Sequence, residues 1–288
     1  MAGGLIMTPV LVSASWLRDN LSLVRVFDTS THLPTVKRDA LAEFTAAHIP
    51  GAMRFDIDTI ADPDHAMPHM VPLPDGFAAA MRGLGLGDED YVVFYDDSDT
   101  RTAARGWWMM RLFGHERVSI LDGGLAAWRG IDGAMDSGDG TTPTPGSFTS
   151  RPAAGVSVVD FDSLAAQVAD GSVGQILDAR AAARFAGEAP EPRAGLRAGH
   201  IPGSRNLPFS ELLNKDGSWK DNDTIRALFI AAGIDPVAPV TASCGSGVTA
   251  CVLAAGLSRL GNDRVTVYDG SWTEWGSSDA PIETGPAS

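Results

Sequence analysis

The sequence is poor in cysteine and has no long apolar run, and each absence limits what the protein can be. Among 288 residues only Cys244 and Cys251 are cysteines. Two cysteines are too few for a disulfide framework and fit a reducing compartment. No run approaches the about 18 apolar residues of a membrane-spanning helix, and the N-terminus lacks the basic segment and apolar core of a signal peptide. We therefore expect a cytoplasmic protein that does not bind a membrane.

Basic residues are also scarce, since 22 Lys and Arg stand against 36 Asp and Glu for a net charge of −14. This balance argues against binding to nucleic acid by bulk charge. An anionic substrate would have to be captured by local arginines. His65 and His69 have no carboxylate or cysteine partner at a metal-ligand spacing, so neither a metal nor another cofactor is expected.

What the sequence does contain is an internal repeat. The motif His-Ile-Pro-Gly occurs at residues 48–51 and again, 152 positions later, at residues 200–203. Three further pairs recur in the same order at offsets of 147 to 150: residues 26–28 with 176–178, residues 117–124 with 264–271, and Trp128 with Trp275. Ordered matches at one period indicate a duplicated unit.

Each copy alternates short β-branched or apolar runs with helical stretches. We predict strands at residues 23–28, 91–95, 118–121, 175–178, 239–243 and 264–268, and helices at residues 74–84, 106–113, 223–232 and 248–260. This alternation predicts an α/β fold of two tandem domains, each a mainly parallel sheet flanked by helices, with function at the carboxyl ends of the strands. We expect a first domain at residues 1–137, a Gly-, Pro- and Ser-rich linker at 138–155 and a second domain at 156–288.

Cys244 opens a glycine-spaced turn, Cys-Gly-Ser-Gly-Val-Thr, between a predicted strand and a predicted helix. The free N–H groups and the dipole of a helix N-terminus would favour a thiolate there. Gly245 and Gly247 would let consecutive N–H groups converge into an anion-binding nest. A lone cysteine is more often a small buried hydrophobe, but the flanking Gly-Ser-Gly favours a reactive thiol.

The tandem copies, the two His-Ile-Pro-Gly motifs, the Asp-Gly turns followed by tryptophan and the loop at residues 244–249 together resemble the two-domain rhodanese superfamily. Within it, the loop is similar to that of 3-mercaptopyruvate sulfurtransferases. The resemblance covers about residues 10–283. It implies a silent first copy and a second copy that carries the catalytic cysteine. The sequence fits, because Asp96 stands where the first copy would have its cysteine, and an aspartate cannot accept sulfane sulfur.

The resemblance implies transfer of sulfur from 3-mercaptopyruvate to a thiol acceptor, such as thioredoxin or a small thiol, through a persulfide on Cys244 with release of pyruvate. Ser246 would hydrogen-bond the substrate or relay a proton, although it is also an ordinary turn residue. The N–H groups around the sulfur would come from Gly245, Gly247, Val248 and Thr249.

The keto-acid substrate needs a carboxylate clamp, which arginine supplies well. The resemblance implies Arg184 and Arg193 as that clamp, although isolated arginines are usually solvated. Arg180 is interpreted as structural, pairing with Asp178 or with a backbone carbonyl.

The resemblance also implies that His48, with Asp39 as its acidic partner, reaches from the first copy towards the cysteine. A structural role is the alternative, since His200 repeats the motif with no second active site to serve.

Three other functions compete with this one. Thiosulfate could be the sulfur donor, with cyanide or a thiol as acceptor, although the neutral Gly245 and Ser246 suit a monocarboxylate better than a dianion. A cysteine phosphatase of this fold needs arginine at the sixth position after the cysteine, where this chain has Ala250. A non-enzymatic sulfur carrier or scaffold is the third alternative.

Overall fold

The computed structural model describes residues 8–33, 35–141, 143–153 and 155–286. They form two five-stranded sheets in which every strand pairing is parallel. The first sheet has the order β1 (Leu11–Val12), β5 (Val118–Leu121), β4 (Val92–Tyr95), β2 (Arg25–Asp28), β3 (Met53–Arg54). The second has the order β6 (Val156–Val159), β10 (Val265–Tyr268), β9 (Val240–Ser243), β7 (Gln175–Asp178), β8 (Arg205–Asn206).

The two sheets have the same strand order, so the predicted α/β fold of two duplicated copies is confirmed. All six predicted strands form, as do the four predicted helices, whose ends lie within three residues of the prediction. The prediction missed the outer strands and six helices. Most of these have seven residues or fewer and show little periodicity, but α6 has ten residues. The helices are α1 (Ala14–Asn20), α2 (Ala40–Ala46), α3 (Pro74–Gly83), α4 (Ala103–Leu112), α5 (Gly124–Gly130), α6 (Phe161–Asp170), α7 (Ala182–Phe185), α8 (Asn222–Ala231), α9 (Ala250–Arg259) and α10 (Ser271–Trp275), with 3₁₀ turns at Leu21–Leu23 and Phe209–Leu212.

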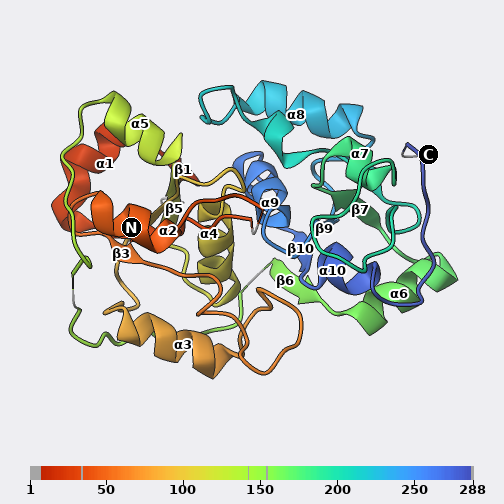
Figure 1. The fold of residues 1–288 in the computed structure, drawn as a ribbon, viewed down its shortest axis with the longest axis horizontal. Helices are drawn as coiled ribbons and strands as arrows, with labels where there is room; N and C mark the ends of the chain where they lie inside the picture. The colour runs from red at the N-terminus through yellow and green to blue at the C-terminus, as the bar shows by residue number, and fades with distance from the viewer. Residues whose placement is uncertain (1–7, 34, 142, 154, 287–288) are drawn as a thin grey trace, which may run out of the picture.

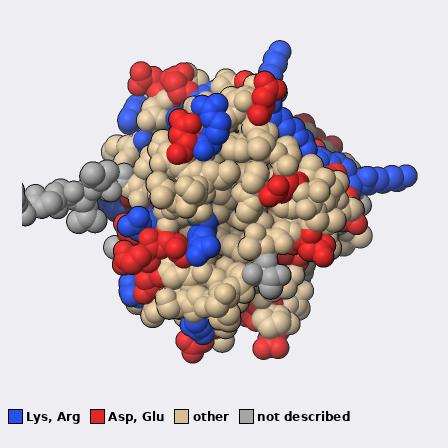
Figure 2. Space-filling model, turned by 90° about the vertical axis from the view of Figure 1, so that its left-hand side faces the viewer, with Lys and Arg blue, Asp and Glu red and all other residues tan. Residues whose placement is uncertain are grey.

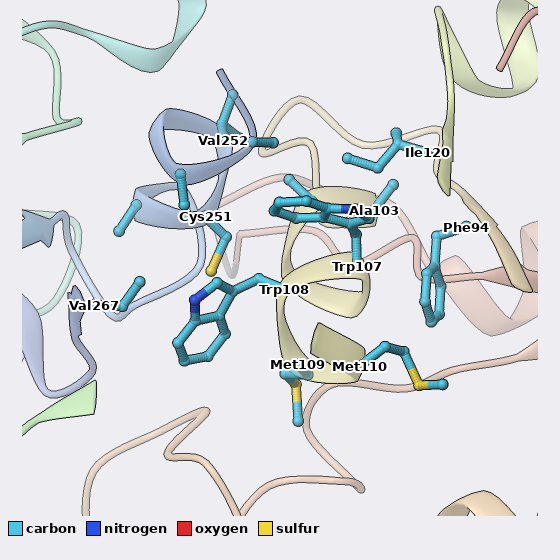
Figure 3. Close-up of a cluster of buried hydrophobic side chains, with 14 of the residues drawn as sticks. Phe94, Ala103, Trp107, Trp108, Met109, Met110, Ile120, Cys251, Val252 and Val267 are labelled. Carbon is cyan, nitrogen blue, oxygen red and sulfur yellow. The ribbon is translucent and has the colours of Figure 1, made fainter. Parts of the chain in front are cut away.

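Helices α4 and α9 lie side by side in the centre of the molecule, between the two sheets (Figure 1). Every residue from 103 to 110 and from 250 to 257 is buried, as expected of a helix covered on all sides. Figure 3 shows Trp107 and Trp108 of α4 in this interface, with the sulfur of Cys251 on α9 directed towards Trp108. One continuous hydrophobic core therefore joins the two copies and fixes their relative position.

Residues 138–155, the predicted linker, contain no helix or strand in their described part. They are nevertheless packed on the first copy. The Phe148 ring is 1% exposed and lies edge-on to Phe77, with 5.8 Å between ring centroids. The Phe148 N–H donates to the Leu86 carbonyl at 2.9 Å. This segment therefore belongs to the surface of the first copy along part of its length.

The charged surface is mixed. On the face in Figure 2, the described Lys and Arg side chains lie among Asp and Glu side chains and form no continuous basic patch. No helix in the described ranges combines the length and the apolarity that a bilayer crossing requires.

The close approach of α4 to its sheet generates a stability prediction. A Cβ on Gly106 would lie 2.8 Å from two ring carbons of buried Phe94, so we expect Gly106→Ala to lower the free energy of unfolding by about 1–3 kcal/mol. Gly83→Ala at the end of α3 is the matched control, because no atom lies within 4 Å of its added Cβ and alanine favours the helix by about 0.5–1 kcal/mol. Denaturant unfolding measures both, and equal stability of the two variants would contradict the packing argument.

Candidate active site

A cavity of about 440 Å³ lies between the two copies and is lined by both. The second copy contributes the loop at residues 244–249, which follows β9, together with Arg184 and Arg193. The first copy contributes Asp58 and His69, from the long connection between β3 and α3. Cys244 lines this cavity although it is only 1% exposed. The cysteine therefore sits at the carboxyl end of a central strand, where parallel sheets place their sites.

Several carbonyl groups of the cysteine loop accept hydrogen bonds from the protein. At the start of α10, the Trp272 N–H donates to the Cys244 carbonyl at 2.9 Å, and Thr273 donates to the Gly245 carbonyl through its N–H at 2.9 Å and its hydroxyl at 2.6 Å. The Gly247 carbonyl accepts from Arg105 Nη1 at 3.2 Å.

The N–H groups of the loop are left free in the described part of the chain, where no protein acceptor takes them at Gly245, Ser246, Val248 or Thr249. Gly247 has φ 73°, and a Cβ there would lie 2.6 Å from Asp269 Oδ1, so the turn requires glycine. A loop with satisfied carbonyls and unsatisfied N–H groups is an anion-binding nest. It suits a thiolate or a persulfide.

Ser271 fixes the cysteine loop through hydrogen bonds to its backbone, a role that sequence reasoning missed. Its Oγ accepts from the N–H groups of Cys244 and Gly247, each at 3.1 Å, donates to the Tyr268 carbonyl at 2.7 Å, and lies 4.0 Å from the Cys244 sulfur. Ser271 has φ 49°, and its counterpart in the first copy is Gly124, with φ 56°. The sequence did contain a signal for Ser271. The repeat aligns this serine with Gly124, and a serine in place of a glycine with a left-handed backbone suggests a specific role for its side chain.

The structure brings both predicted arginines to the cavity. Arg193 donates through Nη2 to His69 Nε2 at 3.3 Å, and its Nε and Nη1 have no protein acceptor among the described residues. Burial lowers its pKa, an effect that the nearby Cys244 opposes. Arg184 Nη2 lies 3.3 Å from where a Cβ on Gly245 would be, so its charge reaches the cysteine loop. The site therefore carries positive charge suited to a carboxylate.

Glu191 holds Arg184 in place. Its carboxylate, 3% exposed, accepts from Nε and Nη2 of Arg184 and from Arg180 Nη1 at 2.8 Å. Arg180 also pairs with Asp178 at 2.7 Å and donates to the Gly199 carbonyl at 2.8 Å, in agreement with its structural interpretation. Sequence reasoning missed the role of Glu191, because its buried position depends on Arg180 and Arg184 folding over it.

The first copy places His69 and Asp58 at the cavity. The His69 ring is 12% exposed, and its Nδ1 lies 2.7 Å from Asp58 Oδ1. Arg193 can only donate, so a hydrogen bond to Nε2 requires the neutral tautomer with its proton on Nδ1. Nδ1 is buried and close to Asp58, but the angle of this contact is not that of a hydrogen bond. The imidazole lowers the pKa of Asp58, which keeps that carboxylate ionised at neutral pH.

His48 lies elsewhere, and its predicted approach to the cysteine is corrected by the structure. The ring is 2% exposed, its Nδ1 lies 2.8 Å from the Phe44 carbonyl, and it stacks on the Phe44 ring. His200 makes the same contacts with Phe185 in the second copy. Neither histidine lines the cavity. The two motifs thus perform one structural task in each copy.

Asp39 is also placed away from the cavity. It is the exposed N-cap of α2, where its carboxylate accepts from the N–H groups of Leu41 and Ala42, each at 3.0 Å. Its predicted partnership with His48 is therefore not formed. The His-Ile-Pro-Gly motif was misleading, because the packing of the two copies decides which first-copy residue reaches the cavity of the second copy. His69 lies in the connection between β3 and α3, outside the repeated motifs.

Asp96 follows β4 as Cys244 follows β9. Its Oδ2 accepts from the Ala103 N–H at 2.7 Å, and burial raises its pKa to about 6. The first copy therefore offers no nucleophile at this position. Cys251, the other cysteine, is also a poor nucleophile, because burial raises the pKa of its thiol to about 12. Among the described residues, no three His, Cys, Asp or Glu side chains gather as metal ligands would.

Comparisons with known proteins agree with this architecture. The rhodanese-like domain model matches residues 13–130 and 160–278. The chain is 41% identical to 3-mercaptopyruvate sulfurtransferase of Escherichia coli K12, covering 96% of this chain and 98% of that protein. It is 37% identical to thiosulfate sulfurtransferase of Bos taurus, covering 95% and 94%. The crystal structure of SseA from Escherichia coli superimposes with a TM-score of 0.81 at 38% identity, over 92% of this chain and 99% of SseA. Two matched domains over most of its length show that this chain belongs to the rhodanese family.

Proposed function

We propose that this protein is a sulfurtransferase that moves sulfur from 3-mercaptopyruvate to a thiol through a persulfide on Cys244 and releases pyruvate. The observation that carries the proposal is the cysteine loop itself. It presents Cys244 and a set of free N–H groups to a cavity that also contains two arginines. The names of the similar proteins, which include 3-mercaptopyruvate sulfurtransferase, support the same donor.

In the first half-reaction the Cys244 thiolate attacks the sulfur of the donor. An S–S bond forms, the C–S bond breaks, and the electron pair goes to carbon as pyruvate enolate. The N–H groups of the loop stabilise the anionic sulfur before and after this step. Arg193 and Arg184 hold the donor carboxylate, so that its sulfur faces the cysteine.

The enolate carbon then needs a proton, which the donor's own S–H can provide. His69 suits this transfer, because its Nε2 lone pair is available once a bound carboxylate engages Arg193. Asp58 would stabilise the imidazolium that forms when His69 accepts the proton. Ser246 lines the same cavity and would relay the proton or bind the donor carbonyl.

In the second half-reaction a thiol attacks the outer sulfur of the persulfide and restores the Cys244 thiolate. Thioredoxin or a small thiol is the proposed acceptor. Both cysteines of the chain are free thiols, which supports the cytoplasm or another reducing compartment as the place of reaction.

Thiosulfate is the second candidate donor, because a similar protein is named thiosulfate sulfurtransferase. The geometry favours the keto acid. The loop carries no cationic side chain, and Arg184 is already engaged by the Glu191 carboxylate. Arg193 therefore supplies most of the free positive charge, which matches one carboxylate better than a dianion.

The covalent step predicts a mass change. After incubation with 3-mercaptopyruvate and no acceptor, the intact protein should gain the mass of one sulfur atom, and Cys244→Ala should gain none. Cys251→Ala is the matched control and should gain the same mass as the parent, since its thiol is buried and protonated. Absence of the added sulfur and of pyruvate would refute the enzyme, and faster transfer from thiosulfate would reverse the order of donors.

The arginine clamp predicts a loss of donor binding. Arg193→Ala and Arg184→Ala should each raise KM for 3-mercaptopyruvate by about 10- to 100-fold, the equivalent of a lost charged hydrogen bond. Lys215→Ala, which removes an exposed cation of the same copy, should leave steady-state kinetics unchanged. Unchanged KM in both arginine variants would rule out the clamp.

His48 and His69, two of the five histidines of the first copy, should separate catalysis from stability. His69→Asn should lower kcat by about 10²- to 10⁴-fold with little change in melting temperature, since asparagine tolerates the left-handed backbone. His48→Asn should lower the melting temperature and leave kcat within about twofold, because His48 binds only the Phe44 carbonyl and ring. The reverse pattern would restore His48 as the catalytic residue.

A further inference from the structure

We infer that Arg105, on helix α4 of the silent copy, is a positioning residue that sets both the cysteine loop and His69 for sulfur transfer. The inference rests on the proposed roles of those two elements. The Arg105 side chain is 1% exposed and does not line the cavity. Its guanidinium donates to three acceptors: the Gly247 carbonyl at 3.2 Å, Asp269 Oδ1 at 2.7 Å and the His69 carbonyl at 2.6 Å.

The first contact acts on the anion nest. The peptide bond between Gly247 and Val248 is planar and trans, so its carbonyl and its N–H point in opposite directions. Arg105 and the Cys251 thiol both donate to this carbonyl, each at 3.2 Å. The Val248 N–H is therefore directed to the other side, where it meets no described protein acceptor. A cation on a carbonyl oxygen also polarises the peptide and makes its N–H a stronger donor. Arg105 thus favours an anion in the nest without touching it.

The other two contacts act on His69. This residue has φ 63°, an uncommon conformation for a residue other than glycine, which persists only where the surroundings impose it. Arg105 holds the His69 carbonyl, and Asp269 Oδ2 accepts from the Val71 N–H at 2.6 Å. The ion pair therefore fixes the backbone on the C-terminal side of the imidazole that lines the cavity.

The repeat provides an internal comparison. Asp122 in the first copy corresponds to Asp269 and likewise reaches across the interface, accepting from the Trp219 N–H at 2.8 Å. Helix α9, however, has an apolar residue at the position that corresponds to Arg105. This residue is Val252 or Leu253, depending on whether the copies are aligned at an offset of 147 or 148. If the Arg105–Asp269 ion pair had only a structural role, we would expect an equivalent ion pair at the matching positions of the other copy. The arginine occurs only opposite the loop that carries a cysteine.

Stability alone also gives little reason for this arginine. A buried ion pair in an otherwise apolar interface is often no more stabilising than packed hydrophobic residues of similar volume. Arg105 and Asp269 are each 1% exposed, and the guanidinium carbon of Arg105 lies 4.9 Å from the centroid of the Trp108 ring. A role at the active site explains why the charge is placed here.

The test removes both charges together, because Arg105→Met alone would leave the Asp269 carboxylate buried without a partner. Arg105→Met/Asp269→Asn keeps an acceptor for Val71 and removes the donors to Gly247 and His69. The matched control is Arg111→Met/Asp263→Asn. Arg111 is on the same helix and pairs with Asp263 across the same interface at 2.7 Å, but neither residue lines the cavity. Arg105→Lys, which keeps the charge without the planar fork, covers the case in which the double variant does not fold.

Two measurements are made on each variant. The first is steady-state kinetics with 3-mercaptopyruvate, in which Arg105→Met/Asp269→Asn should lower kcat by about tenfold or more and change KM by less than about twofold. The second is the pH dependence of alkylation of Cys244 by iodoacetamide, whose midpoint should move to higher pH because the weakened nest binds thiolate less well. Arg105→Lys should show both changes in smaller size, and the Arg111 control should show neither.

Alkylation requires no sulfur donor, so it reports on the loop even if 3-mercaptopyruvate is the wrong substrate. An alkylation profile and a kcat equal to those of the parent would overturn the inference. So would the same losses in the Arg111 control, which would indicate general damage to the interface. A rise in KM that matches the fall in kcat would also overturn it, since that would mean loss of the binding site rather than of positioning.

Discussion

The packing of α4 against α9 is the constraint on which the rest of the structure depends. Both helices are buried along almost their whole length, so neither copy can cover its own central helix in isolation. Their contact creates the shared core and brings the carboxyl edge of the second sheet against the connection that follows β3. The cavity exists because of this contact, since its walls come from both copies.

The two copies have different roles and together form one active site. The second copy retains the cysteine, the nest and the arginines. The first copy has lost the nucleophile at Asp96 and contributes groups that cross the interface, His69 with Asp58 at the cavity and Arg105 beneath the loop. The silent copy is thus a structural part of the active site, and Arg105 of its helix α4 donates directly to the Gly247 carbonyl of the cysteine loop.

Electrostatics explains how a protein with a net charge of −14 can hold an anionic donor and an anionic sulfur. The favourable groups are local and oriented: free backbone N–H groups, the guanidinium of Arg193, and the part of Arg184 not taken by Glu191. Two buried acidic side chains near the site are engaged by cations, Asp269 by Arg105 and Glu191 by Arg180 and Arg184. The acidic surplus lies on the outer surface, far enough through solvent to be screened by salt.

The sequence by itself determined the duplicated α/β architecture and the position of Cys244, because strand and helix periodicity, the repeat offsets and the glycine-spaced loop are properties of local sequence. Arg184 and Arg193 of the cavity were predicted from the resemblance of the sequence to a known family. The sequence could not determine which residues of one copy reach the other. His48 carried the more visible motif, yet it packs on Phe44, whereas His69 crosses to Arg193. Ser271 and Arg105 likewise gain their roles from neighbours distant in the chain. Glu191 gains its role from Arg184 and Arg180, which lie 7 and 11 residues before it. The tertiary structure decided these roles, because contacts across the interface depend on how α4 and α9 pack against each other. A short stretch of sequence does not determine that packing.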